Sequence, residues 1–313
     1  MAFKKNPQVF NASINEVTFG TGEKAVTIGG ENTFPLYTFD APAKNKVAIG
    51  VEIKDSGFDA SLSEIAKFYE GCEGIGQIAK RASEMPGADF VALVLEGADP
   101  NGENKSVEDC VAIAKEVADA IDCPLAILGC KNVEKDTQLF EKVSEALAGK
   151  NVLFVSAREE NYKGIVAASI MAYKQKISAE SAVDINLAKQ LNVLISQMGI
   201  QPENYVMNVG SAAAGYGYEY VASTMDRVRG AALAQNDAML QMPIITPVSQ
   251  EAWAVKEAVV TEEDVPEWGA RQERGVEMEV STAASVIAGG ANAVILRHPK
   301  SVETIAKLVS ELM

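Results

Sequence analysis

Charged side chains that could do chemistry follow several apolar runs of this 313-residue sequence. Lys54 ends one such run, Glu96 follows the run at 90–95, and Asp99 comes three positions later. A lysine in this position can form a Schiff base if desolvation lowers its pKa. Asp55, directly beside Lys54, and the nearby Glu52 favour instead a charged lysine held in an ion pair. The two later carboxylates suit either a magnesium ion or the cap of a following helix.

Arg297 and His298 lie together after a later apolar run, where they could bind an anion or act in acid–base chemistry. Arg297 could equally pair with one of the many acids. His298 is the single histidine, which rules out a multi-histidine metal site. The cysteines lack the short spacings of zinc and iron–sulfur loops and are found at Cys72, Cys110, Cys123 and Cys130. Because no nucleophile has a base beside it, we expect neither catalytic residues nor a metal ion on this chain.

A glycine-rich segment in the second half of the chain is a candidate binding surface. Residues 205–209 predict a buried strand, 210–217 a loop of small residues around Tyr216, and the apolar spacing that follows predicts a helix. In α/β proteins, loops at this end of a strand build the sites. The glycines either let a ligand approach the backbone or only form a turn on which the tyrosines pack.

A long connection from residue 247 to about 274 carries both tryptophans, Trp253 and Trp268. Loops of this length inside a compact domain are usually functional. Two large aromatic rings beside a site predict a broad apolar contact surface. The other interpretation is that the tryptophans anchor a lid helix to the rest of the protein.

The elements that must position these residues alternate between strand and helix. Apolar runs without polar alternation indicate strands buried on both faces, hence a parallel sheet covered by helices; they lie at 47–53, 90–95, 125–128, 152–155, 177–179, 205–209, 244–245 and 293–296. Eight strand–helix units predict an α/β protein with a (β/α)8 TIM barrel over residues 46–313. The doubly wound alternative lacks its dinucleotide fingerprint, since Lys-Asp-Ser-Gly follows the first strand. We expect Ser301 to cap the last helix.

Residues 1–45 form a predicted N-terminal extension with a β-hairpin. Two strand-like runs, 16–19 and 25–28, flank Gly-Thr-Gly at 20–22, which is a hairpin signal. Such a hairpin could close the bottom of the barrel or contact a partner, and both interpretations are open.

The chain is acidic, with 28 basic and 43 acidic residues and a net charge of −15. It has no basic stripe, so we expect neither nucleic acid nor an anionic membrane as a partner. The first seven residues carry two lysines without a following apolar stretch, and no apolar run has membrane-spanning length. We therefore expect a cytoplasmic protein.

Short segments along nearly the whole chain resemble one protein family. They are Gly-Tyr-Gly-Tyr-Glu-Tyr at 215–220, Met-Asp-Arg-Val-Arg at 225–229, Pro-Ile-Ile-Thr-Pro at 243–247, Glu-Ala-Trp at 251–253, Lys-Glu-Ala at 256–258, Trp-Gly at 268–269 and Arg-His-Pro at 297–299. Together with the hairpin end at 26–30 and Pro35, this order resembles the small subunit of the corrinoid iron–sulfur protein of the anaerobic acetyl-CoA pathway. The same family is called the delta subunit of acetyl-CoA decarbonylase/synthase.

The resemblance implies a TIM barrel that pairs with a large corrinoid iron–sulfur subunit. It implies that the partner carries a [4Fe–4S] cluster and that a corrinoid (cobamide) lies at the junction of the two subunits. A methyltransferase then loads methyl from methyltetrahydrofolate, and acetyl-CoA synthase removes it. We expect the loop at 210–219 and the connection at 247–268 to cover one face of the corrin. The candidate cofactor-binding residues are Ser211, Gly215, Tyr216, Gly217, Tyr218 and Trp253.

Two other functions remain open at this point. A free-standing TIM-barrel enzyme acting on a pterin or a small carbonyl compound would rest on Asn208, Glu96 and Lys54 as ligands or catalysts. The second open function is that of a purely structural scaffold that never approaches the cofactor.

Overall fold

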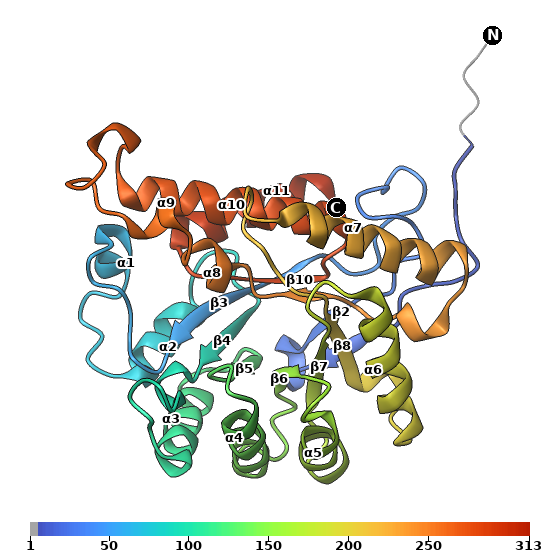
Figure 1. Ribbon diagram of the computed structural model, residues 1–313, viewed down its shortest axis with the longest axis horizontal. Helices are drawn as coiled ribbons and strands as arrows, with labels where there is room; N and C mark the ends of the chain where they lie inside the picture. Colours follow the sequence, from blue (N-terminus) through green and yellow to red (C-terminus); the bar gives the residue numbers. More distant parts are fainter. Residues whose placement is uncertain (1–5) are drawn as a thin grey trace.

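The computed structural model describes residues 6–313. Residues 1–5 lie outside the described residues. They belong to the N-terminal stretch in which we expect no secretion signal. Eight parallel strands form one sheet in the order β8-β7-β6-β5-β4-β3-β10-β9. A parallel bridge between Met207 and Ile244 joins the two ends of this sheet. The sheet is therefore closed, and the predicted (β/α)8 barrel is confirmed (Figure 1).

The barrel strands occupy the predicted apolar runs, within a few residues at each end. Their bounds are β3 Ala48–Lys54, β4 Phe90–Val94, β5 Leu125–Leu128, β6 Leu153–Ala157, β7 Lys176–Glu180, β8 Tyr205–Asn208, β9 Ile245–Thr246 and β10 Ala293–Leu296. Every residue of β4 is buried, because one face meets the barrel interior and the other meets the helices. The apolar core is accordingly divided into one cluster inside the barrel and a larger one between strands and helices.

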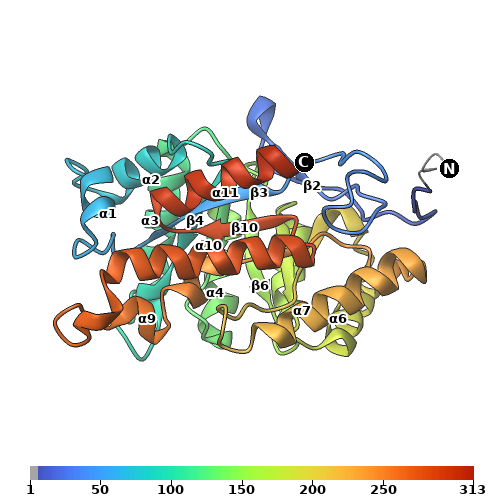
Figure 2. The ribbon, with the colours of Figure 1, turned by 90° about the horizontal axis from the view of Figure 1, so that it is seen from above.

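Helices follow the strands and cover the barrel. They are α1 Ser63–Phe68, α2 Ile75–Ser83, α3 Val107–Ala120, α4 Val133–Ala146, α5 Tyr162–Ile165, α6 Ile185–Gln197, α7 Tyr218–Arg229, α8 Val248–Ala252, α9 Lys256–Val259, α10 Arg271–Gly289 and α11 Pro299–Leu312. π-helical turns extend α5 and α7 at Val166–Ala172 and Gly230–Ala234. Short 3-10 turns occupy Gly22–Lys24, Glu96–Ala98, Pro202–Asn204, Ala238–Leu240 and Pro266–Trp268. The two long C-terminal helices, α10 and α11, lie side by side (Figure 2).

The hairpin of β1 (Val17–Phe19) and β2 (Val26–Ile28) closes the bottom of the barrel. Val17, Phe19 and Ile28 belong to the apolar cluster inside the barrel. The ring of Phe19 meets Phe90, at the start of β4, edge to face with 5.2 Å between centroids. The Asn151 amide, just before β6, donates to two carbonyl oxygens of the hairpin. Of the two open interpretations, the structure therefore shows the hairpin as a plug.

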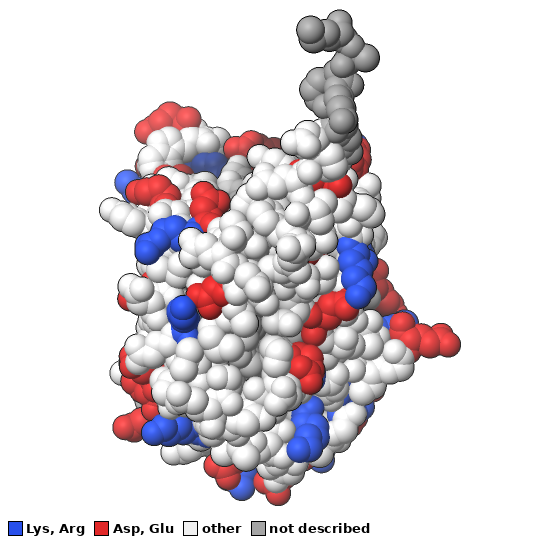
Figure 3. All heavy atoms as spheres, turned by 90° about the vertical axis from the view of Figure 1, so that its right-hand side faces the viewer, with Lys and Arg blue, Asp and Glu red and all other residues white. Residues whose placement is uncertain are grey.

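The direction of the strands distinguishes the two ends of the barrel. The arrows of β3 and β4 point toward the end where α1 and α9 lie, and the N-terminal extension lies at the opposite end (Figures 1 and 2). On that opposite end, charged side chains lie mainly along the margins around a broad uncharged area (Figure 3). Among residues 6–313, no helix is both long and apolar enough to cross a membrane.

The expected cap of the last helix is wrong. The helix α11 starts at Pro299, and the Nδ1 atom of His298 accepts the backbone N–H of Lys300 at 3.2 Å. The N-cap is therefore His298, and Ser301 lies buried inside the first turn. Proline at the first helical position was the signal for this boundary, because its missing N–H costs nothing there.

Candidate functional site

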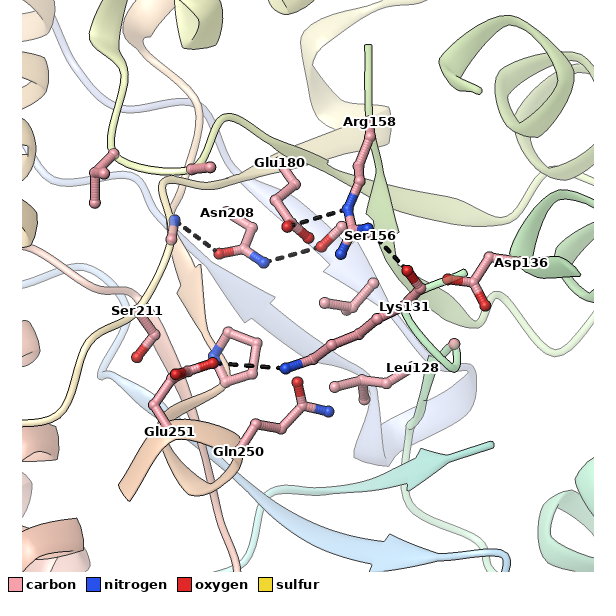
Figure 4. A pocket seen from close by; sticks show the side chains of 16 residues that line it. Leu128, Lys131, Asp136, Ser156, Arg158, Glu180, Asn208, Ser211, Gln250 and Glu251 are labelled. Carbon is pink, nitrogen blue, oxygen red and sulfur yellow. Dashed lines mark hydrogen bonds and ion pairs between the residues drawn. The ribbon is translucent and has the colours of Figure 1, made fainter. Parts of the chain in front are cut away.

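Two of the cavities among the described residues lie on the rim formed by the carboxyl ends of the strands. The first, called the β5–β9 cavity, has a volume of about 260 Å³ (Figure 4). It is lined by Leu128, Gly129, Lys131, Asp136, Val155, Ser156, Arg158, Glu180, Ala182, Val183, Asn208, Gly210, Ser211, Pro247, Gln250 and Glu251. Five neighbouring strands and the loops after them thus contribute to one concave surface.

The charged groups of the β5–β9 cavity are mostly paired with one another. The Nε atom of Arg158 lies 3.2 Å from a carboxylate oxygen of Glu180, and its Nη1 donates to the carbonyl oxygen of Lys131. The Lys131 ammonium lies 3.6 Å from Glu251 (Figure 4). Asp136 accepts hydrogen bonds from the backbone N–H and the thiol of Cys130 instead, and burial raises its pKa. The cavity therefore carries little net charge for a ligand.

A polar network fixes the start of the glycine-rich loop. The amide of Asn208 donates to the hydroxyl of Ser156 at 2.9 Å, and its oxygen accepts the backbone N–H of Gly210 at 3.1 Å. Gly210 has a φ of +94°, and a Cβ there would lie 3.2 Å from the backbone nitrogen of Val183. The left-handed conformation and this close approach explain why glycine stands at this turn.

Three buried hydroxyl groups near this rim lack a hydrogen-bond partner among the described residues. They belong to Ser181 after β7, Ser211 after β8, and Thr246 at the end of β9. An unpaired buried hydroxyl costs free energy, which a ligand with complementary groups recovers. Ser211, which lines the cavity, is therefore available to a ligand.

The second cavity, called the β3–α1 cavity, also has a volume of about 260 Å³. It is lined by Glu52, Ile53, Lys54, Ser56, Gly57, Phe58, Asp59, Ile65, Tyr69, Ile78, Glu96 and Arg297. Here Lys54 contacts Glu96 at 2.6 Å, and Arg297 contacts Glu52 at 2.7 Å. The expected ion pair of Lys54 is thus confirmed, and of the open interpretations of Arg297 the structure shows the ion pair.

The carboxylate that pairs with Lys54 is Glu96, and not one of the acids close to Lys54 in the sequence. Asp55, its neighbour in the chain, pairs instead with Lys105. Burial opposes ionisation of Glu96, but the hydrogen bonds from Lys54 and Ser56 lower its pKa overall. Asp99 accepts hydrogen bonds from Asn101. Across residues 6–313, no group of three or more histidine, cysteine or acidic side chains is arranged to hold a metal ion.

The two candidate loops are neighbours on the rim, as predicted. Gly210 and Ser211 face the same cavity as Pro247 and Gln250. Farther out, the Tyr216 hydroxyl donates to a carboxylate oxygen of Glu257 at 2.6 Å. This bond joins the glycine-rich loop to α9.

Of the predicted cofactor-binding residues, only Ser211 lines the β5–β9 cavity. Gly215, Tyr216 and Gly217 form the outer turn before α7, and Tyr218 is the first residue of that helix. The Tyr216 side chain is 48% exposed, so it can meet a ligand or partner above the rim. Their part in cofactor binding stays a prediction.

Trp253 lies apart from that surface. It is only 7% exposed and stacks on His298, with 5.8 Å between ring centroids. The Arg297 guanidinium lies over the Trp253 ring, 5.8 Å from its centroid. Trp268 is 37% exposed, with the Lys256 ammonium 5.1 Å from its ring. The anchoring interpretation therefore fits Trp253, and the contact-surface interpretation fits only Trp268.

Sequence reasoning missed the two cations of the β5–β9 cavity, Lys131 and Arg158. Arg158 directly follows β6, and Lys131 comes three residues after β5. Their positions at strand ends were the available signal, because this is where barrels place functional side chains. Because acidic residues dominate the same loops, the sequence indicated an acidic rim and not these two cations.

Comparison with known proteins identifies the family. Residues 16–309 match the sequence profile of the family described as "CO dehydrogenase/acetyl-CoA synthase delta subunit". The chain is 29% identical over 298 residues to the acetyl-CoA decarbonylase/synthase complex subunit delta of Archaeoglobus fulgidus, covering 94% of this chain and 65% of that protein. It is 30% identical over 303 residues to the same subunit of Methanocaldococcus jannaschii, covering 94% of this chain and 73% of that protein. The chain thus spans 65% of the length of the Archaeoglobus fulgidus subunit, which is slightly less than two thirds.

Solved structures with a similar fold include dihydropteroate synthases. The enzyme from Xanthomonas albilineans has a TM-score of 0.56 at 9% identity, over 95% of this chain and 98% of that one. The Thermus thermophilus enzyme has a TM-score of 0.53 at 12% identity, over 95% of this chain and 100% of that one. At such identities the likeness shows the barrel fold alone. On the profile match, which spans the whole hairpin and the barrel as far as residue 309 in α11, the chain belongs to the CO dehydrogenase/acetyl-CoA synthase delta subunit family.

Proposed function

We propose that this chain is the small subunit of a heterodimeric corrinoid iron–sulfur methyl carrier. In this role it helps to enclose a cobamide that accepts methyl from methyltetrahydrofolate, through a methyltransferase, and passes it to acetyl-CoA synthase. The large subunit shares the cobamide and carries the [4Fe–4S] cluster. The observation that carries the proposal is membership of the delta subunit family over residues 16–309.

The β5–β9 cavity fits a cofactor that is covered on one face rather than enclosed. Pockets that bury a drug-sized ligand measure about 300–1,000 Å³. A corrin with its amide side chains is larger than such a ligand, whereas this cavity has about 260 Å³. The Ser211 hydroxyl and the Gln250 amide offer hydrogen bonds to neutral amide edges. These features support a shared cofactor.

A bound corrinoid supplies the methyl-transfer chemistry at its cobalt, so this chain has to bind, orient and shield. The ion pairs Arg158–Glu180 and Lys131–Glu251 keep the rim neutral beside an uncharged macrocycle edge. The bond from Tyr216 to Glu257 holds the two rim loops together as a cover. Excluding water in this way suppresses side reactions in closed sites generally.

The geometry does not favour the enzyme acting on a pterin or a small carbonyl compound. Asn208 lines the β5–β9 cavity, whereas Lys54 and Glu96 line the β3–α1 cavity, so the three groups do not face one ligand. A Schiff-base lysine must offer a neutral amine. The amine of Lys54 donates to the Glu96 carboxylate at 2.6 Å.

The test is to purify this chain alone and together with the large subunit, and to compare visible absorption spectra. We expect the two chains to co-elute and the pair to show corrinoid and iron–sulfur bands. The chain alone is expected to show neither. A corrinoid or cluster spectrum from this chain alone, or two chains that do not associate, would contradict the proposal.

A further inference from the structure

The β3–α1 cavity has an aromatic and aliphatic wall that the methyl-carrier role does not use. Phe58, in the loop before α1, stacks on Tyr69, directly after α1, with 5.2 Å between centroids and 28° between ring planes. Ile65 of α1 and Ile78 of α2 are buried and complete this wall. Aromatic side chains pack favourably against a further flat ring, in an offset-stacked or edge-to-face arrangement.

Tyr69 brings an unused hydrogen-bond donor to this wall. Its side chain is 3% exposed, and its hydroxyl has no hydrogen-bond partner among the described residues. Burial and the nearby Glu52, another lining residue, raise its pKa, so the hydroxyl keeps its proton. A buried donor without a partner is costly, and a ligand acceptor removes that cost.

The charges around this cavity are paired within the protein. Lys54 pairs with Glu96 and Arg297 with Glu52, as described above. The third acid, Asp59, contacts Arg271 at 3.1 Å. A charged ligand would have to displace one of these partners, whereas a neutral ligand leaves all three pairs intact.

We propose that the β3–α1 cavity binds a small neutral aromatic compound that carries a carbonyl oxygen. Its ring packs against Phe58 and Tyr69, and its carbonyl accepts the Tyr69 hydroxyl hydrogen. The volume of about 260 Å³ limits the ligand to one or two fused rings. This site is separate from the β5–β9 cavity, so it goes beyond the methyl-carrier role and does not depend on it.

Three probes of the same shape and different charge test the proposal: benzamide, benzoate and benzamidine. Each is titrated into the full chain, and binding is followed by NMR shifts of the protein. We expect benzamide to bind at least about tenfold more tightly than either charged probe, because only benzamide leaves the ion pairs intact. Tighter binding of benzoate would assign the cavity to anions through Arg297, and tighter binding of benzamidine would assign it to cations. Either result, or no binding of any probe, overturns the proposal.

Two tyrosine variants identify the donor. Tyr69→Phe removes only the hydroxyl and is expected to weaken benzamide binding about threefold to tenfold, the effect of one hydrogen bond. Its melting temperature should stay the same or rise, because no partner loses a bond. The control is Tyr205→Phe at the start of β8, whose hydroxyl bonds to the carbonyl oxygen of Asn192, and it should bind benzamide as the parent does. Unchanged binding in Tyr69→Phe, or a lower melting temperature, shows that this hydroxyl serves the protein itself and overturns the proposal.

Discussion

A buried cluster behind Arg297 fixes the chain where β10 ends. The carboxylate of Glu279, on α10, accepts the backbone N–H groups of Arg297 at 2.7 Å and of His298 at 3.2 Å. Trp253 stacks on His298 and lies under the Arg297 guanidinium. Burial raises the pKa of Glu279 and lowers the pKa of His298 to about 4. These residues act on the rim through Arg297, which they position.

The lowered pKa of His298 predicts a loss of stability in mild acid. The unfolded chain takes up a proton at His298 near pH 6.5, whereas the folded chain does so only near pH 4. Stability from this group is therefore present above pH 6.5 and is lost as the pH falls toward 4. Between pH 7 and pH 5 the loss should be about 2 kcal/mol. Urea unfolding at the two pH values measures it.

The control for this experiment is His298→Asn, which keeps a capping oxygen for α11 but does not titrate. Glu279, whose pKa is raised, works in the opposite direction, because its destabilising charge is lost as the pH falls. Glu64 and Lys300 also influence the His298 ring. Since the variant keeps all three groups, the difference between parent and variant isolates His298. Equal pH dependence in the two proteins would show that His298 does not carry the effect.

The two tryptophans are expected to differ in what they contribute to stability. Trp253→Ala removes a buried ring between α8 and His298 and should cost about 3–5 kcal/mol. Trp268→Ala removes a ring that is 37% exposed and should cost about 1 kcal/mol, mainly its contacts with Lys256 and Arg274. Urea denaturation of both variants checks this order. If both variants lose a similar free energy of unfolding, the exposed fractions of the two tryptophans do not reflect how well their rings are packed.

At the level of elements, the apolar runs predicted most of the fold. β5 and β10 have the predicted bounds. Such runs are informative because strands buried on both faces have no polar alternation. The function of the hairpin could not be predicted, because its short apolar runs fit either a plug or a partner contact. Only the interior residues it meets, such as Phe90, distinguish the two.

The hairpin plug should contribute strongly to stability. Phe19 is fully buried inside the barrel, so Phe19→Ala should destabilise the protein by about 3–5 kcal/mol. Thr18, its neighbour, points outward on the same strand, and Thr18→Ala is the matched control with a much smaller expected effect. Thermal unfolding of both variants measures the difference. If the two variants unfold at the same temperature, the hairpin does not act as a plug in solution.

At the scale of the whole molecule, the proposed cofactor surface and the N-terminal extension lie at opposite ends of the barrel (Figures 1 and 2). The eight strand–helix units predicted which loops would share a rim. The position of Ser211 in the wall of the β5–β9 cavity follows from that topology. The pairing of Lys54 with Glu96 was harder to predict, because several acids compete for one lysine and side-chain direction decides. The burial of Trp253 depends on how α8 docks, which the length of the connection does not reveal.

The separation of the two ends allows a controlled test of the rim loops as a cover. In the reconstituted heterodimer, Tyr216→Ala removes an exposed ring and its bond to Glu257, and Phe39→Ala removes a ring that is 58% exposed in the N-terminal extension. Because the Tyr216 ring is exposed and holds the two loops together, its loss should open the cover without preventing assembly. We expect Tyr216→Ala to keep heterodimer formation and cobamide content but to speed oxidation of the bound cofactor in air, followed by visible absorption. Phe39→Ala should leave all three unchanged. If Tyr216→Ala also matches the parent in all three measurements, these loops do not shield the cofactor, and the small subunit acts through another surface.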